Sequence, residues 1–182
     1  MPYSEGFHTW TEAEIEIFRQ YHKVGTKARL AMALLLYVGC RRSDVVKLGR
    51  QNLHGGSISF RQTKNGNRGA FTVENPIHPD LAKELAFVNP NQLLFLQTEN
   101  GKPFSVNGFG NRFRKWCDEA GLKDCSAHGL RKAIATQMAD RGASGHEIMA
   151  YLGQSSPQQS EPYTRNANRK ALAKLAMAKI KR

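Results

Sequence analysis

Ser126-Ala127-His128-Gly129-Leu130-Arg131 is the stretch around which the fold and function of this chain can be organised. Ser126 has the side chain of a helix N-cap, and the helix that follows would carry His128 and Arg131 on one face, about one turn apart. Histidine exchanges a proton near neutral pH, and arginine stays cationic with a planar fork of donors. The pair suits a phosphate group better than a hydrophobic core, although this spacing alone is common in proteins.

The net charge is the strongest feature of the composition. The 182 residues include 27 Lys and Arg against 15 Asp and Glu, which gives a formal charge of +12 and a pI near 9.9. Such a balance favours a polyanionic partner, with nucleic acid as the first candidate and a merely soluble basic protein as the alternative. The basic residues are dispersed along the chain as well as gathered at its end, which fits an anionic membrane surface less well.

The length suits one domain with a real hydrophobic core. The longest apolar run, 30–38, is too short to span a membrane, and the first residues lack the basic and apolar stretches of a signal peptide. Three cysteines, Cys40, Cys117 and Cys125, indicate a reducing compartment. We therefore expect a cytoplasmic protein without membrane association.

Apolar residues recur at helical spacing through most of the chain. The clearest helix starts are two capping boxes, one of Thr11 with Glu14 and one of Ser144 with Glu147, and Gly39 marks a helix end. The pattern predicts helices over 11–22, 26–38, 79–87, 106–120, 127–140, 144–153 and 166–180, a short helix capped by Ser43 that reaches Leu48, and a short buried segment over 93–96.

The periodicity changes to strand alternation between residues 57 and 73. The segments 57–62 and 70–73 flank Asn65-Gly66, a strong signal for a hairpin turn, and Lys64 directly precedes that turn. No internal repeat and no interdomain linker is visible. The expected fold class is mainly α with a small antiparallel β-sheet (α+β).

Five widely separated residues could together cut a phosphodiester without a metal. Attack on phosphorus builds negative charge on the non-bridging oxygens, and bidentate arginine is well suited to stabilise it. A tyrosine hydroxyl, with an ordinary pKa of about 10, needs a cationic setting or a base to attack at neutral pH. A lysine on a hairpin can protonate the leaving sugar oxygen. The chain offers Arg41, Lys64, His128, Arg131 and Tyr163 for these parts.

Four motifs follow one another along the chain. They are Gly39-Cys40-Arg41-Arg42-Ser43-Asp44, then Lys64 before its turn, then His128-Gly129-Leu130-Arg131, and finally Tyr151-Leu152-Gly153-Gln154-Ser155-Ser156 with Pro162-Tyr163-Thr164-Arg165. Together they resemble the first arginine motif, the hairpin lysine, the His-x-x-Arg box and the closing motif of the tyrosine recombinases, the phage-integrase family. The resemblance covers about residues 10–180, and its specificity lies in the ordered combination.

The resemblance implies residues for phosphate binding and proton transfer. Arg41 and Arg131 would bind the scissile phosphate, with Arg42 as the competing choice for the first arginine. Lys64 would be the general acid for the 5′-hydroxyl, and His128 would assist proton transfer.

The resemblance also implies a nucleophile and two further members of the site. Tyr163 would attack and form a 3′-phosphotyrosyl bond, and Asp44 would be a supporting carboxylate. Gln154 stands where the family usually has His or Trp; an amide can donate a hydrogen bond to a phosphate oxygen but carries no charge. Pro162 directly precedes the nucleophile, where its ring can open a helix but removes a backbone donor.

The activity implied by the resemblance is that of a site-specific, integrase-type DNA recombinase from a bacterium, phage or other mobile element, acting without a metal. The alternatives are a non-catalytic DNA-binding homologue and a type IB topoisomerase-like DNA relaxase. The expected partner is double-stranded DNA, on which a protein that is monomeric when free would assemble into a tetrameric synapse. We expect no cofactor and no metal, because the spacing of Cys117, Cys125 and His128 fits no common zinc pattern.

The C-terminal end of the chain is expected to be distinct from the domain that precedes it. Residues 1–163 are expected to form the catalytic domain, 164–182 a basic helical tail, and the N-terminal core-binding domain of the family is expected to be absent. The tail has seven basic residues and no acidic one, with apolar residues at helical spacing. It either folds back on its own domain or, as the resemblance implies, docks on a neighbouring protomer and positions the tyrosine that precedes it.

Overall fold

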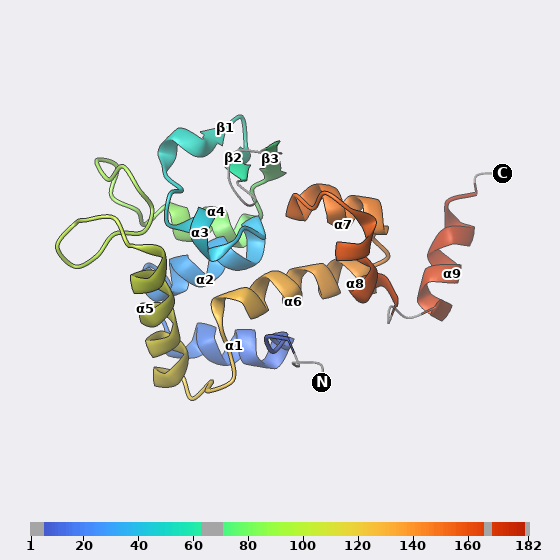
Figure 1. The fold of residues 1–182 in the computed structure, drawn as a ribbon, viewed down its shortest axis with the longest axis horizontal. Coiled ribbons are helices and arrows are strands. Elements are labelled where there is room, and N and C mark those ends of the chain that lie inside the picture. Colours follow the sequence, from blue (N-terminus) through green and yellow to red (C-terminus); the bar gives the residue numbers. More distant parts are fainter. Residues whose placement is uncertain (1–5, 63–70, 166–168, 181–182) are drawn as a thin grey trace.

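Helix α2 (Lys27–Val38) runs through the middle of the fold, which a computed structural model describes for residues 6–62, 71–165 and 169–180 (Figure 1). Every residue from Leu30 to Val38 is buried, as expected for a helix that others surround. The Thr26 side chain caps its start, and Gly39 ends it in the left-handed conformation with φ 64°, which costs glycine no Cβ clash. Both ends agree with the prediction.

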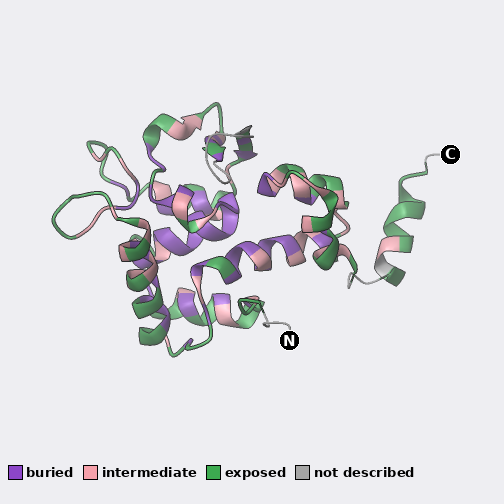
Figure 2. Ribbon diagram, viewed as in Figure 1, coloured by how far each residue is buried: buried purple, intermediate pink, exposed green. Residues whose placement is uncertain are grey.

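Helix α6 (Ala127–Asp140) is the second central element, and its bounds also agree with the prediction. It packs against α2, α5 (Val106–Glu119), α7 (Gly145–Leu152) and α8 (Glu161–Arg165). Figure 2 shows the buried residues concentrated on α2 and along α6. Because α6 contacts elements from both halves of the chain, it can bring motifs that are distant in sequence to one place.

Both predicted capping boxes are present. Thr11 and Glu14 open α1 (Glu12–Tyr21), and Ser144 and Glu147 open α7, each pair with reciprocal side-chain and backbone hydrogen bonds. The remaining helical elements are α3 (Arg42–Val45), η1 (Arg50–Asn52), α4 (Pro79–Leu85), η2 (Pro157–Gln159) and α9 (Arg169–Ala178).

The three described strands form one antiparallel sheet in the order β1 (Leu53–His54), β2 (Ser57–Gln62) and β3 (Phe71–Pro76). The register pairs Phe60 with Val73, and both side chains are buried. The expected Asn65-Gly66 turn lies outside the described residues. The fold class, mainly α with a small antiparallel sheet, is confirmed.

Three local predictions were wrong. Ser43 lies inside α3 and is not its cap, because the chain is already extended at Arg41, whose carbonyl accepts from Asp44 and Val45. Ser126 occupies the N-cap position of α6, but its side chain makes no capping bond, and its buried hydroxyl has no partner among the described residues. Within the segment predicted to be buried, Leu93 is 79% exposed, while Phe95 and Leu96 are buried.

The described part of the tail contacts its own domain through Leu172 and Leu175. A Cβ added to Gly142 would lie 2.5 Å from Leu175 Cδ1, so α9 rests on the turn after α6. Met177 and Ile180 remain 68% and 69% exposed.

Among the described residues, no helix has the length and apolar character needed to cross a membrane. The division into a domain of residues 1–163 and a tail stays a prediction.

Candidate active site

Arg131 is buried at the meeting point of two helix ends. Its Nη2 donates to the carbonyl of Leu152, the last residue of α7, at 2.7 Å, and its Nη1 donates to the carbonyl of Gly39, which ends α2. Helix C-terminal carbonyls attract cations, so these bonds hold the guanidinium firmly. Burial, together with the nearby charge of Arg41, lowers the pKa of Arg131 to about 10, which leaves it cationic at neutral pH.

The sheet is fastened to the same two helix ends. Asn75 in β3 is buried, and its Nδ2 donates to the carbonyl of Val38 at 3.0 Å and to that of Tyr151 at 2.9 Å. Gln62 in β2 is also buried, and its Nε2 lies 3.5 Å from the carbonyl of Leu152. Asn75 and Gln62 therefore fix the strands that lead to Lys64, which itself lies outside the described residues. Our sequence reasoning did not identify either residue.

A cavity of about 340 Å³ opens beside Arg131, between α3, α5 and the start of α6. Its lining residues include four arginines and a histidine: Arg41, Arg42, Arg114, Arg131 and His128. Acidic residues are absent from the described lining. The cavity therefore has the charge that a phosphate group requires.

The two neighbouring arginines of the first motif are placed differently. Arg41 and Arg131 both line the cavity, and the charge of Arg41 contributes, after burial, to lowering the pKa of Arg131. The Arg42 side chain lies against α5, where a Cβ added to Gly110 would be 2.4 Å from its Nη1. This arrangement favours Arg41 over Arg42 as the partner of Arg131.

Asp44 lies on α3, which begins directly after Arg41. It is 4% exposed, and its Oδ2 has no hydrogen-bond partner among the described residues. Burial raises the pKa of its carboxyl, while the charges of Arg41, Lys47 and Arg131 lower it in part. Its place beside both cations suits the supporting role that the resemblance implies.

His128 lies on the exposed side of α6, at the rim of the cavity. Its ring centroid is 4.8 Å from that of Phe7, which also lines the cavity. Partial burial and then the charges of Arg131, Lys132 and Arg41 lower the pKa of His128. The imidazole is therefore neutral at neutral pH and can accept a proton.

Tyr163 lies on α8, which packs against α6, and its ring is half-buried against the core. Burial raises the pKa of its hydroxyl, and the positive charge of Arg131 lowers it in part. The hydroxyl has no hydrogen-bond partner among the described residues. The described lining of the cavity does not include Tyr163.

Gln154 is turned toward the connection between α7 and α8. Its Nε2 donates to the carbonyl of Gln159 at 3.3 Å, and its buried Oε1 has no partner among the described residues. The structure thus brings Arg41, Asp44, His128, Arg131 and Tyr163 together, while the amide of Gln154 bonds to backbone nearby. The roles of all these residues stay predictions.

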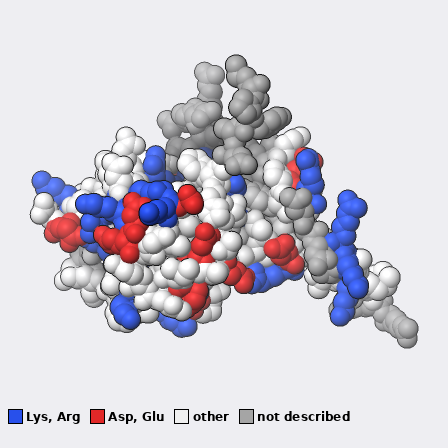
Figure 3. Space-filling view, turned by 90° about the horizontal axis from the view of Figure 1, so that it is seen from below, with Lys and Arg blue, Asp and Glu red and all other residues white. Residues whose placement is uncertain are grey.

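The charge on the outer surface is uneven. On the face shown in Figure 3, Asp and Glu lie among Lys and Arg over the body of the protein. The segment 169–180 has four basic residues and no acidic one, and it forms the blue projection at the right of that view.

Comparison with known proteins connects this arrangement to one family. The phage integrase family matches residues 10–170 of the chain. Tyrosine recombinase XerC of Herpetosiphon aurantiacus is 23% identical over 155 residues, which are 81% of this chain and 51% of that protein. The chain therefore spans about half the length of this curated relative.

Solved structures of recombinases share the fold. The Tn1549 transposon integrase in complex with transposon right end DNA has a TM-score of 0.76 and 19% identity, over 96% of this chain and 66% of that one. XerA recombinase has a TM-score of 0.73 and 19% identity, over 96% of this chain and 65% of that one. At such identities the likeness shows a common fold.

Proposed function

The chain belongs to the phage integrase family, and from this premise we propose that it is the DNA-cutting part of a site-specific recombinase. In this proposal Tyr163 cuts one strand of double-stranded DNA and holds its 3′-phosphate until the strand is rejoined. The observation that carries the proposal is the cavity lined by Arg41, Arg131 and His128, together with the packing of α8, which bears Tyr163, against α6, which bears Arg131.

Arg131, which is buried, and Arg41, which is partly buried, supply the charge for the reaction. A scissile phosphate in the cavity would meet Arg41 and Arg131, whose donors face the extra negative charge of the pentacoordinate transition state. Two of the five N–H groups of Arg131 donate to the carbonyls of Gly39 and Leu152, so three N–H groups are left for the phosphate. A guanidinium held in this way needs little reorganisation when the charge develops.

Proton transfer completes each half of the reaction. The oxygen of Tyr163 forms a bond to phosphorus, the bond from phosphorus to the 5′-oxygen breaks, and Lys64 donates a proton to that oxygen. Neutral His128 helps to move the tyrosine proton, which its lowered pKa permits at neutral pH. Rejoining is the reverse, with a 5′-hydroxyl as the attacking group.

Partner and assembly follow from the same proposal. Double-stranded DNA is the substrate, and two sites are paired in a synapse of four protomers that are monomeric in the free state. The +12 charge supports binding to a phosphate backbone, and the Tn1549 integrase has been solved on DNA. The exposed apolar residues of α9 would dock on a neighbouring protomer, since a helix of this length needs a partner surface in water.

A covalent capture experiment tests the proposal. The chain is incubated with a pool of duplexes that carry a randomised sequence and a nick just beyond it, so that a short cleaved strand diffuses away and the adduct accumulates. Denaturing gels should show a protein–DNA adduct with the wild-type chain and none with Tyr163→Phe, which loses one hydroxyl and no charge. Affinity for the DNA should stay nearly unchanged, because it comes mainly from phosphate contacts.

Tyr21→Phe is the matched control, because Tyr21 is 56% exposed on α1 and lies outside the site. It should form the adduct as the wild type does. An adduct that survives Tyr163→Phe would identify another nucleophile. If the wild-type chain binds DNA but forms no adduct, the recombinase proposal is wrong, and the result favours a non-catalytic DNA-binding homologue.

A further inference from the structure

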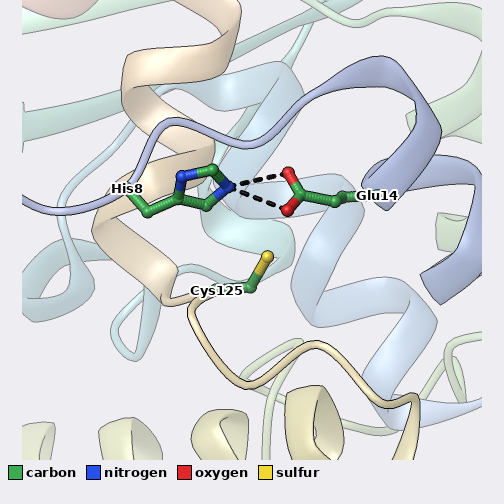
Figure 4. A group of neighbouring side chains, drawn as sticks. All are labelled: His8, Glu14 and Cys125. Carbon is green, nitrogen blue, oxygen red and sulfur yellow. Dashed lines mark hydrogen bonds and ion pairs between the residues drawn. The ribbon is translucent and has the colours of Figure 1, made fainter.

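Three side chains with metal-binding atoms lie close together near the start of α6. His8, Glu14 and Cys125 each place one ligand atom within 4.8 Å of the other two (Figure 4). They come from the segment before α1, the first turn of α1 and the loop before α6. None of them lines the cavity of the candidate active site.

We propose that His8, Glu14 and Cys125 bind a zinc-class divalent ion that fastens the N-terminal segment to the start of α6. Imidazole nitrogen, carboxylate oxygen and thiolate sulfur are the three protein ligands that Zn²⁺ uses. A mixed set of this kind is a poor match for Mg²⁺ or Ca²⁺, which prefer oxygen. The inference is independent of the proposed recombinase function.

The present geometry needs only small movements to accept the ion. With bonds of about 2.0–2.3 Å, a tetrahedral zinc ion holds its ligand atoms roughly 3.3–3.8 Å apart. His8 Nε2 lies 2.8 and 2.9 Å from the two Glu14 oxygens, and all three ligand atoms fall within 4.8 Å of one another. Shifts of about an ångström in side chains would therefore open the cluster around an ion.

Glu14 can bind the ion and keep its structural task. Its Oε2 accepts from the Thr11 backbone N–H at 2.7 Å and from the Thr11 hydroxyl at 3.0 Å, which completes the capping box of α1. Its Oε1 lies 2.8 Å from His8 Nε2, and the Glu14 carboxylate also interacts with the Cys125 thiol, whose pKa it helps to raise. An ion that takes Oε1 and His8 Nε2 would replace the direct contacts between His8 and Glu14 and leave the bonds from Thr11 to Oε2 intact.

Cys125 would supply the third ligand, a thiolate, from the buried side of the site. It is 1% exposed, whereas the His8 side chain is 39% exposed, so the ion would sit at the boundary with a fourth position open to water. The cysteine gives up its proton when the ion binds, and the dication then offsets the carboxylate charge of Glu14 beside the sulfur. Cys117, the neighbouring buried cysteine, lies outside the cluster.

The ion would reinforce contacts that already hold residues 6–10, here called the arm, against α6. A Cβ on Gly129 would lie 2.2 Å from the His8 carbonyl, so the arm crosses the helix at its glycine. Trp10 Nε1 donates to the Ser126 carbonyl at 2.9 Å, and Lys132 Nζ donates to the Phe7 carbonyl at 2.6 Å. A bound ion would thus fix the arm across the helix that carries His128 and Arg131.

This inference departs from our expectation of a chain without a metal. That expectation considered Cys117, Cys125 and His128, of which only Cys125 belongs to the cluster. Residues 8 and 14 meet residue 125 only through the packing of α1 against the loop before α6. The spacing of these three residues along the sequence therefore could not have predicted the cluster.

Cobalt binding tests the site. The full chain is stripped with a chelator, dialysed and titrated with Co²⁺, whose bond to a thiolate gives a charge-transfer absorption in the near ultraviolet. One Co²⁺ per chain should bind with this absorption, and Zn²⁺ should displace it. His8→Ala and Cys125→Ala should each weaken Co²⁺ binding at least tenfold, and Cys125→Ala should remove the absorption.

Two variants serve as controls, Cys117→Ala for a buried cysteine outside the cluster and His146→Ala for an exposed histidine elsewhere. Both should bind Co²⁺ as the wild type does. Hydrogen exchange supplies a second measurement: Zn²⁺ should slow exchange in the arm of the wild type and not in His8→Ala, which removes an exposed side chain and should fold. Binding without the thiolate absorption, equal binding by His8→Ala, or no binding would each overturn the proposal.

Discussion

Replacement of Arg131 by lysine should destabilise the protein even in the absence of DNA. Lysine keeps the positive charge but has no fork, so it can reach only one of the two carbonyls, Gly39 and Leu152, that the guanidinium holds. A hydrogen bond to a charged group contributes about 1.5–3 kcal/mol, and one such bond is lost. The free energy of unfolding should therefore fall by about 1.5–3 kcal/mol. For a chain of this size, this lowers the Tm by roughly 3–12 °C.

Urea and thermal unfolding followed by circular dichroism measure this loss, and an unchanged urea m-value would show that the unfolding transition itself is the same. Arg141→Lys is the matched control. Arg141 follows the last residue of α6 and also donates to a backbone carbonyl, at 3.3 Å, but its side chain is 66% exposed. The control should stay within about 0.5 kcal/mol of the wild type. If Arg131→Lys were equally stable, the guanidinium would not tie the two helix ends together.

Three further outcomes are expected. Cleavage should proceed in EDTA, because Arg41, Arg131 and Lys64 supply the charge and the proposed ion lies outside the cavity; activity that disappears and returns with magnesium would contradict this mechanism. Gln154→His should change the cleavage rate within roughly tenfold, or ~1.4 kcal/mol, whereas a much larger gain would favour the non-catalytic reading of the native chain. Deletion of residues 167–182 should spare the fold, as measured by circular dichroism, and abolish multi-protomer complexes on DNA together with strand exchange. A shortened chain that still assembles would rule out exchange of the tail between protomers, and one that does not fold would favour packing on its own domain.

Local signals in the sequence predicted most of the helices well. The capping boxes of α1 and α7 and the glycine at position 39 depend on residues within one turn, so the prediction needed no knowledge of the rest of the fold. The capping bond predicted for Ser126 is absent, and the local sequence could not show why. At Ser126 the backbone carbonyl accepts from Trp10, more than a hundred residues earlier, and the hydroxyl is buried without a capping bond.

The supporting residues of the site could not be predicted in the same way. Asn75 and Gln62 lie on strands whose inward positions are otherwise apolar, and a polar residue at such a position was the only signal that could have pointed to them. Their partners are carbonyls at the ends of two distant helices, which pattern and spacing do not specify. The motif residues were found because the family resemblance supplied the long-range information.

The double attachment of Arg131 has a consequence for how this fold can change over evolutionary time. A lineage that stops cutting DNA loses the selection for cleavage but still needs α2 and α7 held together, so it should retain this arginine. Tyr163 is under no such constraint, because its hydroxyl bonds to none of the described residues, and phenylalanine could replace it at little cost to stability. In a survey of descendants, inactivity should therefore be recognised by substitution of the tyrosine, and the presence of the arginine should not be taken as a sign of an active enzyme.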